Sequence, residues 1–127
     1  MTIAYFATFL DRARAGLRLA AHDEARLVEL VRATPGLTRG LAFTPSATSD
    51  PYLHDGAPPP LALELYFASI DALEAALARA GHLQQLARAD ALPSLAGAAV
   101  TQQAMLARAY PVPDPVCRTA AGERPCT

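Results

Sequence analysis

The sequence contains no Lys, no Asn and no Trp, and it has only two cysteines among its 127 residues. All eleven basic residues are therefore Arg, which together with the abundant Ala is typical of a GC-rich, bacterial genome. Twelve acidic residues bring the net charge to -1, and this balance argues against non-specific binding to nucleic acid. Cys117 and Cys126 both lie near the C-terminus, so a disulfide framework through the fold is not expected.

Long apolar runs and the common chemical motifs are also missing. No stretch approaches the roughly 20 apolar residues that cross a bilayer, so no membrane partner is expected. The N-terminal run Ile3–Leu10 lacks a basic leader and is followed by Asp11, so it does not predict a signal peptide, and the expected location is the cytoplasm. The three histidines have no metal-ligand spacing, and Gly-rich phosphate loops and nucleophile elbows are absent. We therefore expect no metal and no cofactor.

What is present is an ordinary globular composition, with 52% apolar and 18% charged residues. Residues 1–113 are predicted to form one domain, and the Pro-rich residues 114–127 a tail or linker. The pattern predicts the following elements in chain order: a strand at Ile3–Leu10, a helix capped by Asp23 and stopped by Pro35–Gly36, a strand at Leu37–Pro45, a strand at Leu61–Phe67, a helix capped by Ser69 and ended by Gly81, a short helix at 82–89, and a strand at Ala98–Val112.

This order is the split βαβ pattern of an α+β, ferredoxin-like domain, βαββαβ, with a four-stranded antiparallel sheet. Right-handed crossovers would place both helices on one side of the sheet and leave the other face open. In Leu61–Phe67 the leucines alternate with Glu64 and Tyr66, which predicts that these two residues lie on the open face. In Leu37–Pro45, Leu37 is expected to share a face with Arg39.

The strand at Ile3–Leu10 is apolar on both faces, so the open face is predicted to be too apolar to meet water. Two such sheets stacked face to face would bury it. The sequence therefore predicts a homodimer, or pairing with a second similar domain, and a small-molecule pocket between the sheets.

The predicted pocket suggests a set of site residues. Glu64 and Tyr66 are candidate catalytic residues, because a carboxylate partly removed from water becomes a better proton acceptor. The structural alternative is that Glu64 forms an ion pair with Arg39 or Arg108. His54 lies in the long loop before Leu61 and is a third catalytic candidate, since it can act as acid or base near neutral pH. Three further residues are predicted to contact the ligand: Tyr5, Arg39 and Gln103.

Three stretches, "ATPGLTRGLAFTP", "LALELYFASIDALEAAL" and "LPSLAGAAVTQQAM", resemble the dimeric α+β barrel superfamily and, within it, EthD-like proteins. The resemblance covers about Ile3 to Val112. It implies a homodimer and a small-molecule ligand, because members include small monooxygenases and muconolactone isomerase-like enzymes. The His that EthD-type sequences carry before the Pro-Gly turn is not matched here, where Leu27 and its neighbours stand.

Two functions are consistent with these observations. The first is a small-molecule-binding barrel, of the cofactor-independent monooxygenase or isomerase type, that acts on a small apolar or aromatic compound. The second is a non-catalytic ligand-binding or assembly module whose paired sheets form only an interface. A cavity lined by Glu64 and Tyr66 would favour the first function, and a filled interior the second.

Overall fold

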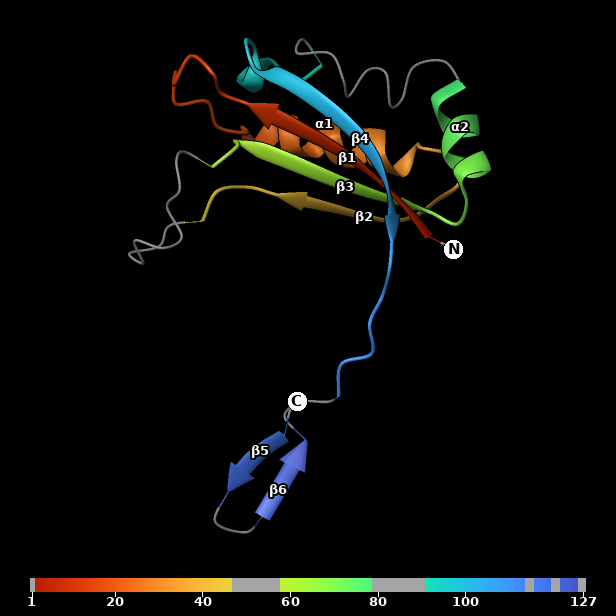
Figure 1. Ribbon diagram of the computed structural model, residues 1–127. Helices are drawn as coiled ribbons and strands as arrows, with labels where there is room; N and C mark the ends of the chain where they lie inside the picture. Colours follow the sequence, from red (N-terminus) through yellow and green to blue (C-terminus); the bar gives the residue numbers. More distant parts are fainter. Residues whose placement is uncertain (1, 47–57, 79–90, 114–115, 120–121, 126–127) are drawn as a thin grey trace.

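The computed structural model describes residues 2–46, 58–78, 91–113, 116–119 and 122–125. Its main sheet is antiparallel and has the strand order β2-β3-β1-β4 (Figure 1). The elements are β1 (Thr2–Leu10), α1 (Ala21–Arg32), β2 (Leu37–Phe43), β3 (Leu61–Phe67), α2 (Ile70–Ala78), the 3₁₀ helix η2 (Pro93–Leu95), β4 (Ala99–Ala107), β5 (Val116–Thr119) and β6 (Gly122–Pro125). The predicted α+β, ferredoxin-like βαββαβ architecture is confirmed.

Each strand ends where its pattern or its partner strand ends. β3 has the predicted bounds, because strict alternation marks both of its ends. β4 ends at Ala107 and does not continue to Val112, because Ala107 pairs with Thr2, the first residue of β1. The residues after 113 include a separate two-stranded hairpin of β5 and β6. The predicted end of the second helix at Gly81 and the short helix at 82–89 lie outside the described residues.

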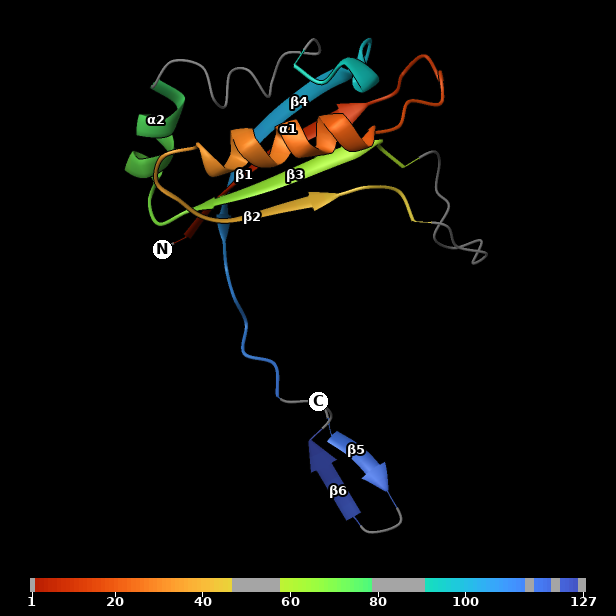
Figure 2. The ribbon, with the colours of Figure 1, turned by 180° about the vertical axis from the view of Figure 1, so that it is seen from behind.

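The core lies between the sheet and the two helices. Register places Phe67, Leu65, Leu63 and Leu61 of β3 beside Ile3, Tyr5, Ala7 and Phe9 of β1, and all of these side chains are buried. α1 crosses this face of the sheet, whereas no helix of the described residues lies on the opposite face (Figures 1 and 2). Both helices add apolar side chains to the same buried cluster. Each fully buried Leu or Phe stabilises such a core by about 1.5–3 kcal/mol.

The sequence predicted that Asp23 caps α1, and this prediction is wrong. The helix begins earlier, at Ala21, and its N-cap residue is Ala20, which has no side-chain cap. The Asp23 carboxylate is instead buried, with 1% exposure, and accepts a hydrogen bond from the Ser94 backbone N–H at 2.7 Å. The Ala20 N–H in turn donates to Ser94 Oγ at 3.1 Å. These bonds connect the first turn of α1 to η2, and the hydrogen bonds from Ser94 hold the pKa of Asp23 below its usual value.

A bulge in β2 places Leu37 and Arg39 on opposite faces of the sheet, so the prediction that they share a face is wrong. Leu37 pairs with Phe67, and Arg39 pairs with the adjacent Tyr66, so Thr38 is an extra residue in this strand. One extra residue moves the side chains that follow it to the opposite face. Leu37 therefore packs against the core, whereas Arg39 turns to the open face.

Candidate functional site

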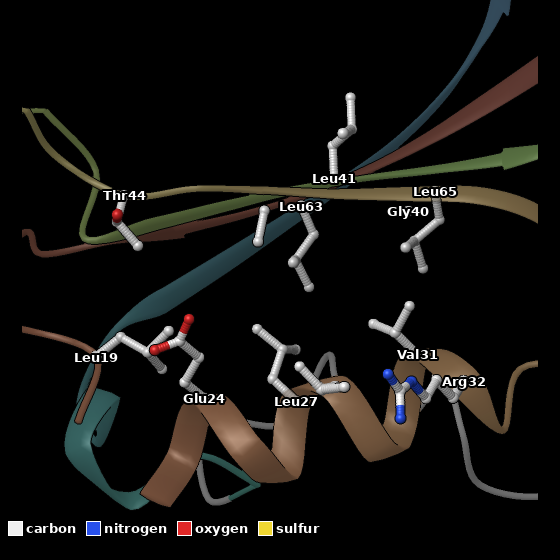
Figure 3. Close-up of a pocket in the computed structure, with 12 residues that line it drawn as sticks. Leu19, Glu24, Leu27, Val31, Arg32, Gly40, Leu41, Thr44, Leu63 and Leu65 are labelled. Atoms are coloured by element: carbon white, nitrogen blue, oxygen red, sulfur yellow. The ribbon is translucent and has the colours of Figure 1, made fainter. Parts of the chain in front are cut away.

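A cavity of about 310 Å³ lies between α1 and the β2–β3 side of the sheet. Figure 3 shows α1 on one side of this space and the two strands on the other. The cavity lies on the helix-covered face, not on the open face where a pocket was predicted. The residues that line it are Leu19, Glu24, Leu27, Val28, Val31, Arg32, Gly40, Leu41, Ala42, Thr44, Leu63 and Leu65.

The cavity exists because β2 presents small residues to α1. After the bulge, Gly40 and Ala42 share the helix-facing side with Leu65 and Leu63, their partners on β3. At Gly40 the helix is close, since a Cβ there would lie 3.0 Å from Val31 Cγ1. The side chain of Leu41 points away from the helix (Figure 3). The helix-facing positions of β2 that follow the bulge therefore hold no side chain larger than that of Ala42. The space left beside Ala42 is the cavity.

Among the described residues that line the cavity, three have polar side chains: Glu24, Arg32 and Thr44. Glu24 points from α1 toward the sheet (Figure 3). Neither Glu24 nor Arg32 has an ion-pair partner among the described residues, where the one ion pair joins His22 to Asp23 at 3.3 Å. The two charges are eight residues apart on one helix, which corresponds to about 12 Å along its axis. The cavity therefore has an unpaired negative charge toward one end and an unpaired positive charge toward the other.

The open face carries a separate cluster of polar side chains. Its register confirms that Glu64 and Tyr66 lie on the face away from the helices. The Tyr66 hydroxyl donates a 2.7 Å hydrogen bond to Glu64 Oε2, and this bond raises the pKa of Tyr66. The Arg39 guanidinium lies 6.0 Å from the centre of the Tyr66 ring. The expected ion pair of Glu64 with Arg39 or Arg108 is not formed within the described part of the chain, where Tyr66 is the partner of Glu64.

Gln103 joins this face, because Phe6 pairs with Glu64 on one side and with Gln103 on the other. Tyr5 does not join it. Tyr5 is buried on the helix-covered face, where its hydroxyl donates a 2.6 Å hydrogen bond to Gln102 Oε1, and burial raises its pKa to about 12. The sheet thus separates Tyr5 from Glu64. His54 lies outside the described residues.

Among the predicted site residues that the structure describes, none lines the cavity. Glu64, Tyr66 and Arg39 lie together on the open face, and Gln103 lies on the same face across β1. The catalytic and ligand-binding roles of these residues stay predictions. Sequence reasoning missed Glu24 and Arg32, which stand in "EARLVELVR" on the predicted helix. Their spacing of eight residues was a usable signal, because it places two opposite charges roughly two turns apart on one side of a helix.

The open face also exposes large apolar side chains. Phe43 of β2 is 47% exposed and Met105 of β4 is 55% exposed. Register puts Phe43 beside Ala62, and Met105 beside Ala4, on the side opposite the helices. This face therefore combines an apolar surface at both sheet edges with the polar cluster of Arg39, Glu64, Tyr66 and Gln103.

No group of three or more His, Cys, Asp or Glu side chains among the described residues is arranged to hold a metal ion. Within the same residues, no helix has the length and apolar character required to cross a membrane.

The order and pairing of the strands, with helices on one face of the sheet, are those of a ferredoxin-like fold, which this chain shares with several solved structures. One similar solved structure is an ethyl tert-butyl ether d (ethd) family protein from Bacillus halodurans, with 15% identity, a TM-score of 0.58 and coverage of 85% of this chain and 100% of that one. A second is a mutant of SnoaB, a cofactor-independent oxygenase from Streptomyces nogalater, with 18% identity and a TM-score of 0.54. The match covers 86% of this chain and 95% of that one.

A third similar structure is that of a protein from Deinococcus radiodurans whose assignment as an antibiotic biosynthesis monooxygenase is itself a proposal. It is 19% identical to this chain, with a TM-score of 0.54 and coverage of 88% of this chain and 98% of that one. No family model matches the sequence. No curated protein matches it either. At these identities the structural likeness establishes the fold, and the chemistry has to be argued from the site.

Proposed function

We propose that this protein is a homodimer whose open sheet faces stack, and that each subunit binds a small apolar or aromatic molecule beneath α1. The observation that carries the proposal is the cavity of about 310 Å³ on the helix-covered face. Its volume falls at the lower end of the range for small-molecule sites, about 300–1,000 Å³. Its walls are mainly Leu and Val, with few polar groups, which is the usual composition of such sites.

The dimer is supported by the chemistry of the open face. Burial of the exposed side chains of Phe43 and Met105 would stabilise a dimer by removing apolar surface from water. The described residues of this face include only two charged ones, Arg39 and Glu64, which form no ion pair. Burying about 800 Å² of mostly apolar surface contributes on the order of 10 kcal/mol or more before the costs of association. Sedimentation velocity should show a dimer at micromolar concentration. A monomer at high concentration would contradict the proposal.

The proposed reaction class is cofactor-independent oxygenation or isomerisation, which begins with removal of a proton from the substrate. Support for it comes from the fold shared with the SnoaB oxygenase and from the carboxylate of Glu24, which is among the described side chains that line the cavity. A carboxylate within hydrogen-bond reach of a bound substrate can act as a general base. The alternative, a non-catalytic module, predicts a dimer that converts no substrate.

A second place for the chemistry is the open-face cluster, where we propose Glu64 and Tyr66 as acid–base groups, with His54 as a further candidate. The hydrogen bond of 2.7 Å between Tyr66 and Glu64 favours it, since it aligns a proton donor with a carboxylate. In a stacked dimer this cluster would be enclosed between the sheets. Glu64→Gln should then abolish turnover of any identified substrate, and Glu24→Gln should not. The opposite result would place the base in the cavity.

The cavity itself can be tested with one pair of variants. Ala42→Leu would fill the space between β2 and α1, whereas Ala25→Leu makes the same change on an exposed position of α1 that does not line the cavity. Native mass spectrometry of the purified protein should detect a bound small molecule in the wild type and in Ala25→Leu, and not in Ala42→Leu. Equal occupancy in both variants would show that the molecule binds elsewhere.

A further inference from the structure

We infer that the ligand of the cavity is an elongated apolar carboxylate, held with its carboxylate at Arg32 and a hydrogen-bond donor at Glu24. This inference rests on the proposed function, because it requires the cavity to bind a small molecule. It adds the chemical class of the ligand and its direction in the site.

The first step concerns the unpaired charges. Arg32 and Glu24 both line the cavity, and neither is paired within the described residues. Both residues are exposed, so water hydrates their charges in the free protein. A neutral apolar ligand would gain nothing from either charge, whereas a ligand with a carboxylate and a hydrogen-bond donor can form a charge-assisted hydrogen bond with each. Such bonds to exposed groups are modest in strength, and they favour the second kind of ligand.

The second step concerns the anionic end. A guanidinium presents a planar set of N–H donors that matches the two oxygens of a carboxylate. Arg32 lies in the last turn of α1, so its charge is at the C-terminal end of the cavity. If the ligand bound in the reverse direction, its carboxylate would face Glu24 and be repelled. Like-charge contacts of this kind select one orientation by penalising the other.

The third step concerns length and the opposite end. The two charged residues are eight positions apart, about 12 Å along the helix. Apolar side chains, among them Leu27, Val28 and Leu63, line the cavity with them. The ligand therefore needs an apolar body of roughly two fused rings between its carboxylate and a hydroxyl or other donor. The Glu24 carboxylate accepts from that donor.

Binding of three naphthalene probes to the full chain tests this inference. The probes are 6-hydroxy-2-naphthoic acid, its amide, 6-hydroxy-2-naphthamide, and 2-naphthoic acid, which lacks the hydroxyl. Fluorescence titration should show the hydroxy acid binding about three- to tenfold more tightly than the amide, because an exposed Arg forms modest charge-assisted bonds. The hydroxy acid should also bind more tightly than 2-naphthoic acid.

Matched variants assign each preference to a residue. Arg32→Gln should bring the acid-to-amide ratio close to one, Arg32→Lys should retain part of it, and Arg26→Gln, on the same helix but outside the cavity, should leave it unchanged. Glu24→Gln should reduce the preference for the hydroxyl, whereas Glu29→Gln, also outside the cavity, should not. The Lys variant keeps the test decisive if the Gln variant fails to fold, because loss of the bidentate geometry must then lower the ratio.

The outcomes separate the two proposals. If acid and amide bind with equal affinity, or if the ratio persists in Arg32→Gln and Arg32→Lys, recognition of a carboxylate is refuted and the apolar cavity site stands. If none of the three probes binds, the proposal of an apolar small-molecule site of this size is refuted, and the inference about its ligand with it.

Discussion

Replacing Asp23 by Ala should destabilise the protein by about 2 kcal/mol, because the buried carboxylate connects α1 to η2. Its removal deletes a charge-assisted hydrogen bond of 2.7 Å and leaves the Ser94 N–H without that acceptor. Hydrogen bonds to charged groups contribute about 1.5–3 kcal/mol, and an unsatisfied buried donor costs a similar amount. For a domain of this size we expect the midpoint of thermal unfolding to fall by about 6–12 °C.

Chemical denaturation measures the free energy of unfolding directly. Asp71→Ala is the matched control, because Asp71 also lies in the first turn of a helix but is exposed, so it should cost less than about 1 kcal/mol. Asp23→Asn should fall between the wild type and Asp23→Ala, since its amide oxygen can still accept from Ser94. A loss below about 0.5 kcal/mol for Asp23→Ala would refute the reasoning.

The lowered pKa of Asp23 gives this prediction a dependence on pH. A carboxyl whose pKa is lower in the folded state stabilises the fold fully above its ordinary pKa of about 3.9, and this contribution is lost as the pH falls through the lower folded value. The stability difference between the wild type and Asp23→Asn should therefore shrink as the pH falls from about 5 through the lowered folded pKa of Asp23. A difference that stays constant over this interval would show that the charge of Asp23 contributes nothing.

Three other changes test separate parts of the structure. Tyr5→Phe should cost about 1 kcal/mol in urea denaturation, because it deletes the hydrogen bond to Gln102, and it should remove a tyrosine that titrates near pH 12. Gly40→Val should destabilise the protein by about 1–3 kcal/mol, because a Cβ added at this position would lie only 3.0 Å from Val31 Cγ1; an unchanged midpoint would show that α1 moves away without cost. Met105→Asp should shift the proposed dimer toward monomer in sedimentation velocity without lowering helix content by circular dichroism, and an unchanged dimer would exclude this edge of the open face from the interface.

The elements that sequence reasoning located correctly are those with a single strong pattern. β3 alternates strictly between Leu or Phe and smaller or polar residues, so its bounds and its two faces were readable. Ser69 was recognised as the cap of α2, and its hydroxyl oxygen does accept the Ala72 N–H at 3.1 Å. In both cases the information is local: β3 is recognised from its own alternation, and Ser69 bonds to a residue three positions further along the chain.

The errors occurred where the deciding partner is distant in the sequence. Asp23 looked like a cap because its partner, Ser94, is 71 residues away. β4 looked longer because apolar residues continue past Ala107, although β1 has no further residue with which to pair. Tyr5 could not be assigned to a face, because β1 is apolar on both sides and its alternation carries no signal. The cavity was missed because it is the space that the small residues Gly40 and Ala42 leave unfilled between β2 and α1.

The bulge at Thr38 explains why the two candidate sites can exist on opposite faces of one edge strand. Before it, Leu37 packs into the core; after it, Gly40 and Ala42 face α1, while Arg39 and Phe43 face the other way. A regular strand with Leu37 in the core would direct Arg39 and Phe43 toward α1 as well, which would fill the space and bury a charge. One extra residue thus produces both the room beneath α1 and the Arg39 position beside Tyr66. The small-molecule site and the proposed dimer face therefore depend on the same local feature of β2.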